Sequence, residues 1–245
     1  MERLAAGARR IGLHLSPEQL EQFEVYYREL TDWNRRVNLT SVTDYEEVQV
    51  RAFLDSLTVA LVWQPPSGAG SPVGESPAVI DIGTGAGLPG VPLRIAFPGI
   101  RLVLLEATGK KADFLYHLRE RLDLGDVEVI VGRAEEVAHR EVYRERFDLV
   151  LSRAVARLST LAELTLPFCA SGGIFVGHKK GNVDWEIRRA DAAIAAMGGR
   201  LREVKAVGLP EFTDRRCLVV IHKVSPTPEK YPRRPGMPAK RPLLS

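Results

Sequence analysis

The sequence has few of the residues that hold metals or form disulfide frameworks. Its 245 residues include two cysteines, Cys169 and Cys217, which are far apart and belong to no C-x-x-C pair. The five histidines show no spacing that is typical of metal ligands. These absences argue against a zinc ribbon, a disulfide framework and a structural metal. We expect Cys169 to follow Phe168 in a helix and Cys217 to lie in a late strand, both as core thiols.

Long apolar runs are also lacking. None approaches the roughly 18 residues that a membrane-spanning helix needs, and residues 1–10 contain three arginines with no hydrophobic stretch behind them. The sequence therefore predicts that the protein has neither a membrane span nor a secretion signal. We expect it to be cytoplasmic. A hydrophobic fraction of 45% and a charged fraction of 27% are typical of a globular chain with a sizeable core.

Charge is unevenly distributed along the chain. The formal net charge is +3, but residues 1–75 contain 7 Lys/Arg and 11 Asp/Glu, whereas residues 223–245 contain 6 and 1. The basic end also holds six of the 16 prolines, so we expect it to be extended and not helical. Such a tail suits a nucleic-acid phosphate backbone, although its charge is equally compatible with a solvated, disordered end.

The first third of the chain is predicted to be helical. Ser16 and Gln19 form a capping box with Pro17 at the first helical position. The apolar residues that follow share one helical face: Leu20, Phe23, Tyr26, Leu30, Trp33 and Val37. A second helix is expected over residues 44–62, and Trp33 and Phe53 are expected to be core residues, not platforms for bases. Residues 65–77, rich in Pro, Gly and Ser, predict a linker.

From residue 78 onward, short aliphatic runs alternate with longer mixed segments. The runs cover residues 78–82, 101–106, 127–131, 147–152 and 172–176. Buried strands separated by segments long enough for crossover helices are typical of an α/β fold with a doubly wound parallel sheet. Two later runs, 200–207 and 216–223, are expected to form an antiparallel pair at the sheet edge.

The first predicted strand ends in a glycine-rich turn. The segment Asp81-Ile82-Gly83-Thr84-Gly85-Ala86-Gly87-Leu88 places an acid at the strand end and three alternate glycines after it. Glycines there let a ligand approach the main chain closely. Glu106, at the end of the second strand, is suited to accept hydrogen bonds from both hydroxyls of a ribose. The combination predicts a nucleoside site at the carboxyl ends of the strands.

Three nucleoside cofactors compete for this site. A P-loop is excluded because Val91 and Pro92 stand where Lys and Ser/Thr must hold phosphate and magnesium. A dinucleotide fingerprint fits the letters from Gly85 to Gly90, but it starts late after the strand, and Asp81 would sit poorly beside a pyrophosphate. S-adenosylmethionine carries a sulfonium and an ammonium, which favour a nearby acid. The pattern resembles motif I of the class I methyltransferases.

The absence of two motifs reduces the number of possible methyl acceptors. Exocyclic amine methylation in this superfamily uses an Asn/Asp-Pro-Pro-aromatic motif after strand four, where this chain has Ser152-Arg153-Ala154-Val155. Pyrimidine C5 methylation needs a cysteine nucleophile. A ring nitrogen with a free lone pair, such as guanine N7, needs neither device, because alignment and desolvation suffice.

Five ordered blocks extend the resemblance beyond a superfamily. They are residues 33–41, 51–57, 81–92, 152–154 and 231–240. Together they resemble the glucose-inhibited-division protein B family, the small-subunit rRNA guanine-N7 methyltransferases of bacteria. The resemblance implies a Rossmann-like class I methyltransferase sheet of seven strands, with a helical N-terminal extension (residues 1–75), a catalytic domain (76–223) and a basic Pro-rich tail (224–245). It implies S-adenosyl-L-methionine as donor, S-adenosyl-L-homocysteine as product, and N7 of guanine 527 in 16S rRNA as acceptor.

The resemblance also implies roles for particular residues. It puts the cofactor against Asp81, Gly83, Thr84, Gly85, Gly87, Leu88, Glu106, Ala107, Thr108, Ala134, Glu135 and Arg153. It puts RNA against Lys179, Lys180, Arg233, Arg234, Lys240 and Arg241. Arg153 would position the substrate at the mouth of strand four, with no general base, although a surface ion pair is its other interpretation. Lys179 and Lys180 are expected in a turn after strand five, where a merely solvated turn is the alternative.

Two departures from the family pattern bear on these roles. Many relatives have Arg-His where this chain has Arg51-Ala52, so any role of that histidine is absent here. The basic tail is not present in every member, and we expect it to assist RNA binding without being needed for the chemistry. A small-molecule methyltransferase of the same fold and a non-catalytic RNA-binding module stay open as alternatives. The expected partner is 16S rRNA or the small ribosomal subunit, with the protein acting as a monomer.

Overall fold

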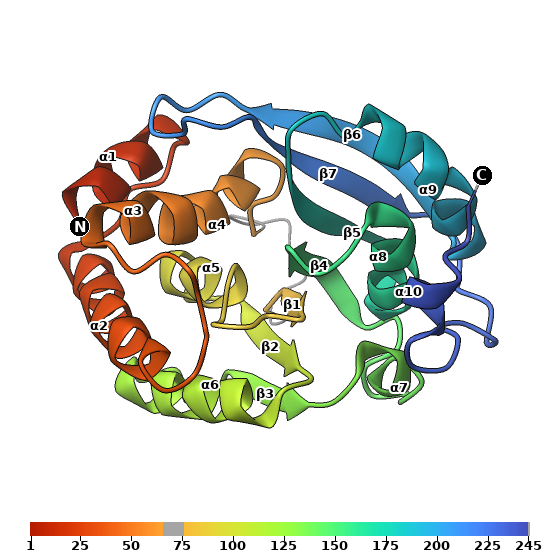
Figure 1. The fold of residues 1–245 in the computed structure, drawn as a ribbon, viewed down its shortest axis with the longest axis horizontal. Helices are drawn as coiled ribbons and strands as arrows, with labels where there is room; N and C mark the ends of the chain where they lie inside the picture. Colours follow the sequence, from red (N-terminus) through yellow and green to blue (C-terminus); the bar gives the residue numbers. More distant parts are fainter. Residues whose placement is uncertain (66–75, 245) are drawn as a thin grey trace.

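The computed structural model describes residues 1–65 and 76–244. Its centre is a seven-stranded sheet in the order β3-β2-β1-β4-β5-β7-β6, with helices on both faces (Figure 1). Strands β1 to β5 are parallel, and β7 runs antiparallel to β5 and β6. The strands are β1 Ala78–Ile82, β2 Arg101–Glu106, β3 Glu128–Val131, β4 Phe147–Arg153, β5 Cys169–Lys180, β6 Gly199–Val207 and β7 Arg216–Lys223. The predicted α/β class is confirmed.

Alternate residues of the central strands face two separate hydrophobic cores. Val79 and Leu149 lie in one core, whereas Ile80 and Val150 lie in the other. This period of two is the pleat of a strand, and burial on both faces explains why these runs are almost continuously apolar. All five residues of β1 are buried, including the carboxylate-bearing Asp81.

The N-terminal helices cover one face of the sheet and share its core (Figure 1). They are α1 Glu2–Arg10, α2 Pro17–Asn34, α3 Tyr45–Val48 and α4 Asp55–Leu57, and they are followed on the same face by α5 Gly90–Ala96 and α6 Gly109–Arg121. The capping box of α2 is confirmed: the Gln19 amide donates to Ser16 Oγ, and the Ser16 amide donates to Gln19 Oε1 at 2.8 Å. Helix α1 lies in the third of the chain predicted to be helical, although no separate helix was assigned before Ser16, and it packs through the buried Leu4 and Ala8.

The predicted single helix over residues 44–62 is wrong in detail. A π-helical segment, Gln49–Leu54, separates α3 from α4, and a 3₁₀ turn, Thr58–Leu61, follows. The carbonyls of Arg51 and Ala52 in the π-helical segment accept hydrogen bonds from Arg153 at 3.3 and 3.4 Å. π-Helical turns are rare and occur frequently at functional sites. The π-helical segment is therefore the one that Arg153, distant in sequence, contacts. The periodicity of residues 44–62 alone does not reveal this contact.

The second face carries α7 Ala134–Val137, α8 Leu158–Thr165, α9 Asp184–Ala196 and the C-terminal tail (Figure 1). The tail is not wholly extended, because Met237–Lys240 forms the short helix α10. Arg144 donates to the carbonyls of Thr227 and Tyr231, and Arg233 donates to Glu163 of α8. These contacts attach the tail to the domain. Within the described residues, no helix is long and apolar enough to cross a membrane.

Two further expectations about β5 are corrected. The strand continues to Lys180, so Lys179 and Lys180 are its last two residues and do not follow it in a turn. Cys169 is the first residue of β5 and not part of a helix, because the 3₁₀ turn Leu166–Phe168 ends before it. Both cysteines are buried free thiols, as expected, and Cys217 lies in β7. Pairing with β4 and β7 on its two sides supports the longer β5.

Candidate active site

The glycine turn after β1 presents two of its residues outward and buries the rest. Gly83 and Gly85 are half-buried and have φ angles of 66° and 60°, which disfavour residues with a Cβ. A Cβ on Gly83 would lie 2.8 Å from Val155 Cγ2, whereas one on Gly85 would meet nothing within 4 Å. Thr84 and Leu88 are buried. Gly83 and Gly85 are therefore the turn residues that a ligand can approach from outside.

Asp81 lies beneath this turn and holds it in shape. Its Oδ2 accepts hydrogen bonds from Thr84 Oγ1 at 2.6 Å and from the Gly90 amide at 2.9 Å. The other oxygen, Oδ1, is buried without a hydrogen-bond partner in the described structure. Burial raises the pKa of Asp81 to about 6, and the two hydrogen bonds only partly oppose that rise. A nearby positive charge would restore the ionised form.

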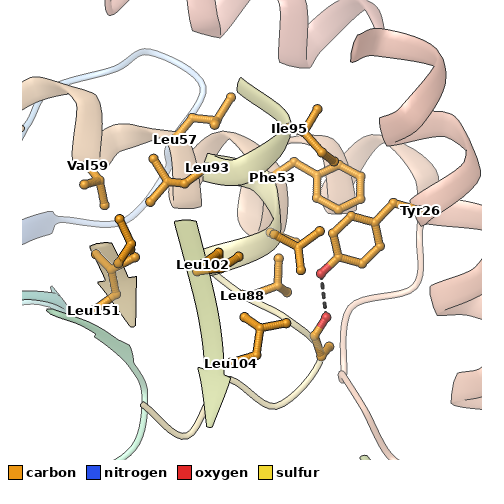
Figure 2. Packing of buried hydrophobic residues seen from close by; sticks show 14 of the residues in the cluster. Tyr26, Phe53, Leu57, Val59, Leu88, Leu93, Ile95, Leu102, Leu104 and Leu151 are labelled. Carbon is orange, nitrogen blue, oxygen red and sulfur yellow. Dashed lines mark hydrogen bonds between the residues drawn. The ribbon is translucent and has the colours of Figure 1, made fainter. Parts of the chain in front are cut away.

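Helix α2 supports the turn from the other side (Figure 2). The Tyr26 hydroxyl donates to the Ala86 carbonyl, and the ring packs against Phe53 with centroids 4.9 Å apart. A Cβ on Gly87 would lie 3.0 Å from the Tyr26 hydroxyl and 2.8 Å from Val91, so this glycine allows close packing. Tyr26 was predicted as a core residue, but the sequence did not show that the N-terminal helices reach the glycine turn. Phe53 is fully buried, and Trp33 is partly buried against the same core, as expected.

Glu106 stands beside the turn at the end of β2. Its two carboxylate oxygens accept hydrogen bonds from the Gly85 amide at 2.9 Å and the Thr108 amide at 2.8 Å. These bonds fix the carboxylate and leave lone pairs on both oxygens. Ala107 and Thr108, which follow it, are exposed at the same edge of the sheet. The arrangement can accept hydrogen bonds from a pair of hydroxyls, as the sequence predicted for a ribose.

Ala134 and Glu135 begin α7, directly after β3. Both are half-buried, and Glu135 Oε1 accepts a hydrogen bond from the Gly236 amide of the tail at 2.9 Å. Because β3 and β2 are neighbours in the sheet, α7 starts beside the strand end that carries Glu106. The family resemblance implied that these two residues lie near the cofactor, but it did not indicate that the tail reaches the same segment.

A cavity of about 370 Å³ opens at the ends of β4 and β5. Its walls come from the loop before α3, the π-helical segment and the two strand ends: Thr40, Ser41, Val42, Arg51, Ala52, Asp55, Arg153, Ala154, His178, Lys179 and Lys180. Arg153 is held here by Asp55 Oδ2 at 3.1 Å and by the two π-helical carbonyls. Arg153 thus forms an ion pair and also lines a cavity, so its two interpretations are not exclusive.

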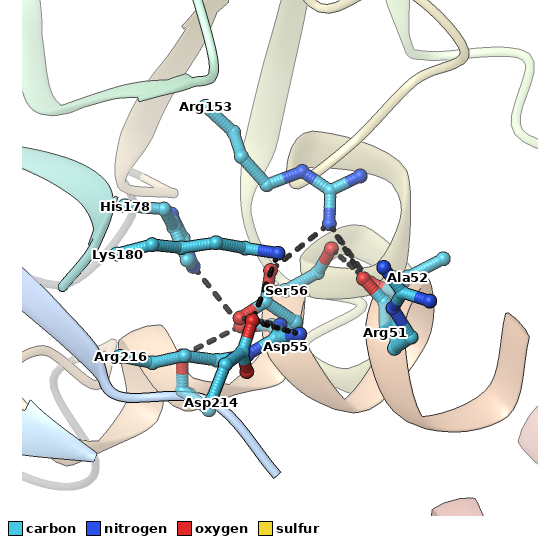
Figure 3. A network of polar contacts seen from close by, with 10 residues as sticks. Arg51, Ala52, Asp55, Ser56, Arg153, His178, Lys180, Asp214 and Arg216 are labelled. Atoms are coloured by element: carbon cyan, nitrogen blue, oxygen red, sulfur yellow. Dashed lines mark hydrogen bonds and ion pairs between the residues drawn. The ribbon is translucent and has the colours of Figure 1, made fainter. Parts of the chain in front are cut away.

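Asp55 is the centre of the polar network around this cavity (Figure 3). It is 6% exposed and pairs with Arg153 and, at 2.6 Å, with Arg216 of β7. Asp214 binds Arg216 at 2.7 Å and Lys180 at 3.1 Å. Burial opposes ionisation of Asp55, but the neighbouring positive groups outweigh it and lower its pKa. The network joins the N-terminal helices to three strands of the sheet.

His178 is a second buried member of the network. Its Nε2 lies 3.0 Å from the Asp55 carbonyl, which can only accept, so Nε2 carries a proton. Burial lowers the pKa of His178, although the Asp55 carboxylate opposes this, and the ring is neutral at pH 7. Its Nδ1 is buried with no partner in the described structure.

Asp55, His178 and Arg216 were not among the predicted site residues. Asp55 belongs to the family block 51–57, and His178 lies near the end of a strand, which were the available signals.

The predicted RNA-contacting cations fall into two groups. Lys179 binds Glu186 at 2.6 Å and the Ala156 carbonyl at 2.9 Å, and the Arg233 guanidinium binds the buried Glu163 at 2.6 Å. Lys180 pairs with Asp214 but is 57% exposed. The remaining cations, Arg234, Lys240 and Arg241, are exposed on the docked tail. Among the residues described, no cluster of His, Cys, Asp or Glu is able to hold a metal ion.

Comparison with known proteins identifies the family. The model of the GidB family, rRNA small subunit methyltransferase G, matches residues 19–216. The chain belongs to this family. The Ribosomal RNA small subunit methyltransferase G of Dehalococcoides mccartyi is 49% identical over 244 residues and is covered completely, as is this chain. The protein of the same name from Roseiflexus castenholzii is 48% identical over 245 residues, again with both chains fully covered.

A solved structure supports the fold. The crystal structure of the antibiotic-resistance methyltransferase Kmr has a TM-score of 0.51, with 15% identity over 63% of this chain and 90% of that chain. The predicted class I methyltransferase fold is confirmed, and the GidB family is one of methyltransferases dependent on S-adenosylmethionine.

The residues of the glycine turn fit this donor. Asp81 has an unpartnered oxygen and a raised pKa, so a cationic group nearby would favour its carboxylate form. Gly83 and Gly85 leave the main chain accessible, and Glu106 holds acceptors beside them.

Proposed function

We propose that this member of the GidB family transfers the methyl group of S-adenosyl-L-methionine to N7 of a guanine, guanine 527, in 16S rRNA of the small ribosomal subunit. The observation that carries the proposal is the adjacency of two sites at one edge of the sheet. The glycine turn follows β1 and Glu106 ends β2, and the Arg153-lined cavity lies at the end of β4, which pairs directly with β1. A donor and an acceptor bound there would lie side by side.

The donor site is proposed to consist of residues at the ends of β1, β2 and β3. Gly83, Gly85 and Leu88 provide the turn, Glu106 the acceptors for the ribose, and Ala134 with Glu135 the surroundings of the adenine. When bound, S-adenosyl-L-methionine supplies an electrophilic methyl group on a positively charged sulfur, and S-adenosyl-L-homocysteine remains. Asp81 contributes negative charge from below the turn, and together with Thr84 and Gly87 it keeps the turn in shape.

Arg153 is proposed to position the guanine in the cavity. Its contacts with described residues all use Nη1, so Nη2 and Nε remain able to donate. A guanidinium pairs readily with guanine O6, which lies next to N7 on the same edge of the base. The Asp55 carboxylate and two backbone carbonyls fix this guanidinium before the substrate arrives, which lowers the entropic cost of alignment.

No general base is needed for methylation at N7. This nitrogen has a lone pair and no proton, so no proton has to leave before the methyl group is transferred. The carboxylate in the cavity wall agrees with this, because Asp55 is engaged by Arg153 and Arg216. The chain's contribution is therefore alignment and exclusion of water.

Incubation with methyl-labelled S-adenosyl-L-methionine tests the proposal. Unmodified small ribosomal subunits and their stripped rRNA are used in parallel, and the labelled nucleoside is identified after digestion. Recovery of 7-methylguanosine from either substrate supports the proposal, and mapping the nucleotide tests position 527. Absence of label despite measurable donor binding would contradict it and favour a small-molecule acceptor. Gly83→Val, which should not bind the donor, serves as the inactive control.

We further propose that the protein works as a cytoplasmic monomer on the small subunit. Both proposed subsites are built from one chain, and assembling ribosomal subunits are found in the bacterial cytoplasm. Light scattering after size-exclusion chromatography is expected to give one chain of 27.1 kDa, with and without donor. A stable dimer that loses methyl transfer when dissociated would contradict this.

A further inference from the structure

Trp185 is an exposed tryptophan at the start of α9. It lies in the first turn of α9 and is 52% exposed. The other two tryptophans are half-buried and pack on phenylalanine rings: the ring centroids of Trp33 and Phe114 lie 5.7 Å apart, and those of Trp63 and Phe97 lie 6.3 Å apart. Exposing an indole leaves apolar area in water that a partner could cover. Trp33 was expected to be a core residue and not a platform for bases, whereas the structure leaves the indole of Trp185 accessible.

Two arginines accompany the exposed indole. The guanidinium of Arg189, one helical turn further along α9, lies 4.7 Å from the ring centroid, and that of Arg157 lies 6.0 Å away. Both side chains belong to exposed residues. The three residues line a hollow of about 130 Å³ together with Glu186 and, from the tail, Pro242. An aromatic face with two guanidiniums offers stacking to a base and positive charge to its phosphate.

The position of this hollow relative to the acceptor cavity is fixed by Glu186. Its Oε1 accepts hydrogen bonds from the Leu158 amide at 2.5 Å and from Lys179 Nζ at 2.6 Å. Lys179 also donates to the Ala156 carbonyl, and it lines the acceptor cavity. The start of α9 is thus attached to the loop that follows β4.

The loop that follows β4 connects the acceptor cavity to the Trp185 hollow. It follows Arg153, in the wall of the acceptor cavity, and ends at Arg157, in the wall of the Trp185 hollow. Four residues of extended chain span about 14 Å at most, a distance that a few nucleotides of RNA cover.

We propose that Trp185, flanked by Arg157 and Arg189, is a stacking site for an unpaired base of the RNA substrate close to the methylated guanine. The inference rests on the proposed function, because it assigns a second contact of the same substrate. Stacking tolerates any base, so this site contributes affinity and orientation, whereas Arg153 contacts the guanine itself.

Substitution of the indole provides the test. Trp185→Ala is expected to weaken binding of a 16S rRNA fragment by about 5- to 100-fold at fixed salt, while Trp185→Phe retains most of the affinity. Donor affinity should be unchanged in both variants. The slope of log affinity against log salt should also stay the same for Trp185→Ala, because no phosphate contact is removed, and should become shallower for Arg189→Gln.

Tyr116→Ala is the matched control. Tyr116 is also an exposed aromatic residue, at 37%, with Arg119 over its ring at 5.7 Å, but it lies on α6. An equal loss of RNA affinity in Tyr116→Ala and Trp185→Ala would overturn the inference, as would RNA binding by Trp185→Ala within twofold of the unmodified protein. A loss seen with assembled subunits but not with naked rRNA would mean that the indole contacts a ribosomal protein. If the unmodified protein binds donor but methylates no RNA, the proposed function fails and the inference fails with it.

Discussion

Single residues divide the glycine turn into an inner and an outer set. Gly83 and Gly85 face outward, whereas Asp81, Thr84 and Gly87 face the core. Glycines of the same motif therefore have different structural roles, and we expect their substitution to have different effects.

Gly83→Val is expected to abolish donor binding. The new side chain would have to adopt a strained φ of 66° and would collide with Val155 Cγ2, so the turn or the Val155 side chain must shift. Isothermal titration with S-adenosyl-L-methionine measures the effect. Gly12→Ala is the control, because Gly12 has a similar φ of 78° but nothing within 4 Å of the added Cβ. Normal donor binding by Gly83→Val would count against the proposed site.

Asp81 predicts a pH dependence of donor affinity. Its pKa in the folded protein, about 6, is higher than the unfolded value of 3.8, so the folded form retains this proton between those pH values. The unfolding free energy therefore falls by about 3 kcal/mol in total as the pH rises from about 4 to about 6, since each pKa unit corresponds to about 1.4 kcal/mol. A cationic donor offsets that cost. We expect donor affinity to rise between pH 5 and 7.

Titration of the Asp81→Asn variant checks the assignment. An asparagine oxygen can still accept from Thr84 and Gly90, but the residue no longer ionises. Its donor affinity should be lower at pH 7 and nearly independent of pH. If donor affinity of Asp81→Asn still rose with pH as in the unmodified protein, the pH dependence would belong to another group, such as His178, whose pKa is lowered.

At the scale of elements, the C-terminal tail combines docking with exposed charge. Arg233 pairs with Glu163, which is 1% exposed as a side chain, whereas Arg234, Lys240 and Arg241 face solvent. Deleting residues 224–245 would therefore remove the positive side chains proposed to contact RNA. It would also leave the buried carboxylate of Glu163 without its partner. Selective neutralisation separates these two effects.

The triple variant Arg234→Gln, Lys240→Gln, Arg241→Gln is expected to keep its fold and bind RNA less tightly. Each lost phosphate contact flattens the salt dependence by about 0.7 on single strands, so the slope should fall by about 2. Filter binding at several salt concentrations measures it. Arg233→Gln is the contrasting variant: it should lower the thermal midpoint and leave the slope nearly unchanged. Equal slopes in the triple variant and the unmodified protein would remove the tail from the RNA interface.

Across the whole molecule, the N-terminal helices and the sheet form one unit. They share a hydrophobic core, and Tyr26 bonds to the glycine turn, while Asp55 bonds to Arg153 and Arg216. The described part of the predicted extension, residues 1–65, thus supports the glycine turn and contributes walls to the acceptor cavity. Its role in the activity follows from these contacts and not from a separate function.

Tyr26→Phe should reduce donor affinity although Tyr26 lies outside the donor site. Loss of its hydroxyl leaves the Ala86 carbonyl without this buried bond, at a cost of about 1–3 kcal/mol in unfolding free energy. The loosened turn should then bind the donor more weakly. Urea unfolding and donor titration measure the two effects. Tyr27→Phe removes an exposed hydroxyl bonded to the Thr43 carbonyl and should change neither. Unaltered donor affinity in Tyr26→Phe would show that the turn is independent of α2.

The sequence by itself determined the elements whose causes are local. The capping box at Ser16 set the start of α2, and the buried aliphatic runs set β1 and β2 with the predicted bounds. The motif from Asp81 to Leu88 and the acid at Glu106 predicted a donor site, which stays a proposal, because strand ends of a parallel sheet meet at one edge. Both signals are contained in a few neighbouring residues.

Only the tertiary structure decided which groups, distant in sequence, form ion pairs and hydrogen bonds or line the same cavity. Asp55 meets Arg153 from 98 residues away, and Gly236 of the tail meets Glu135 from 101 residues away. The π-helical segment and the docked tail depend on such partners, and the exposure of Trp185 depends on which surfaces the fold leaves uncovered. Local propensity cannot encode these features, because the energies that select them arise between segments brought together by folding.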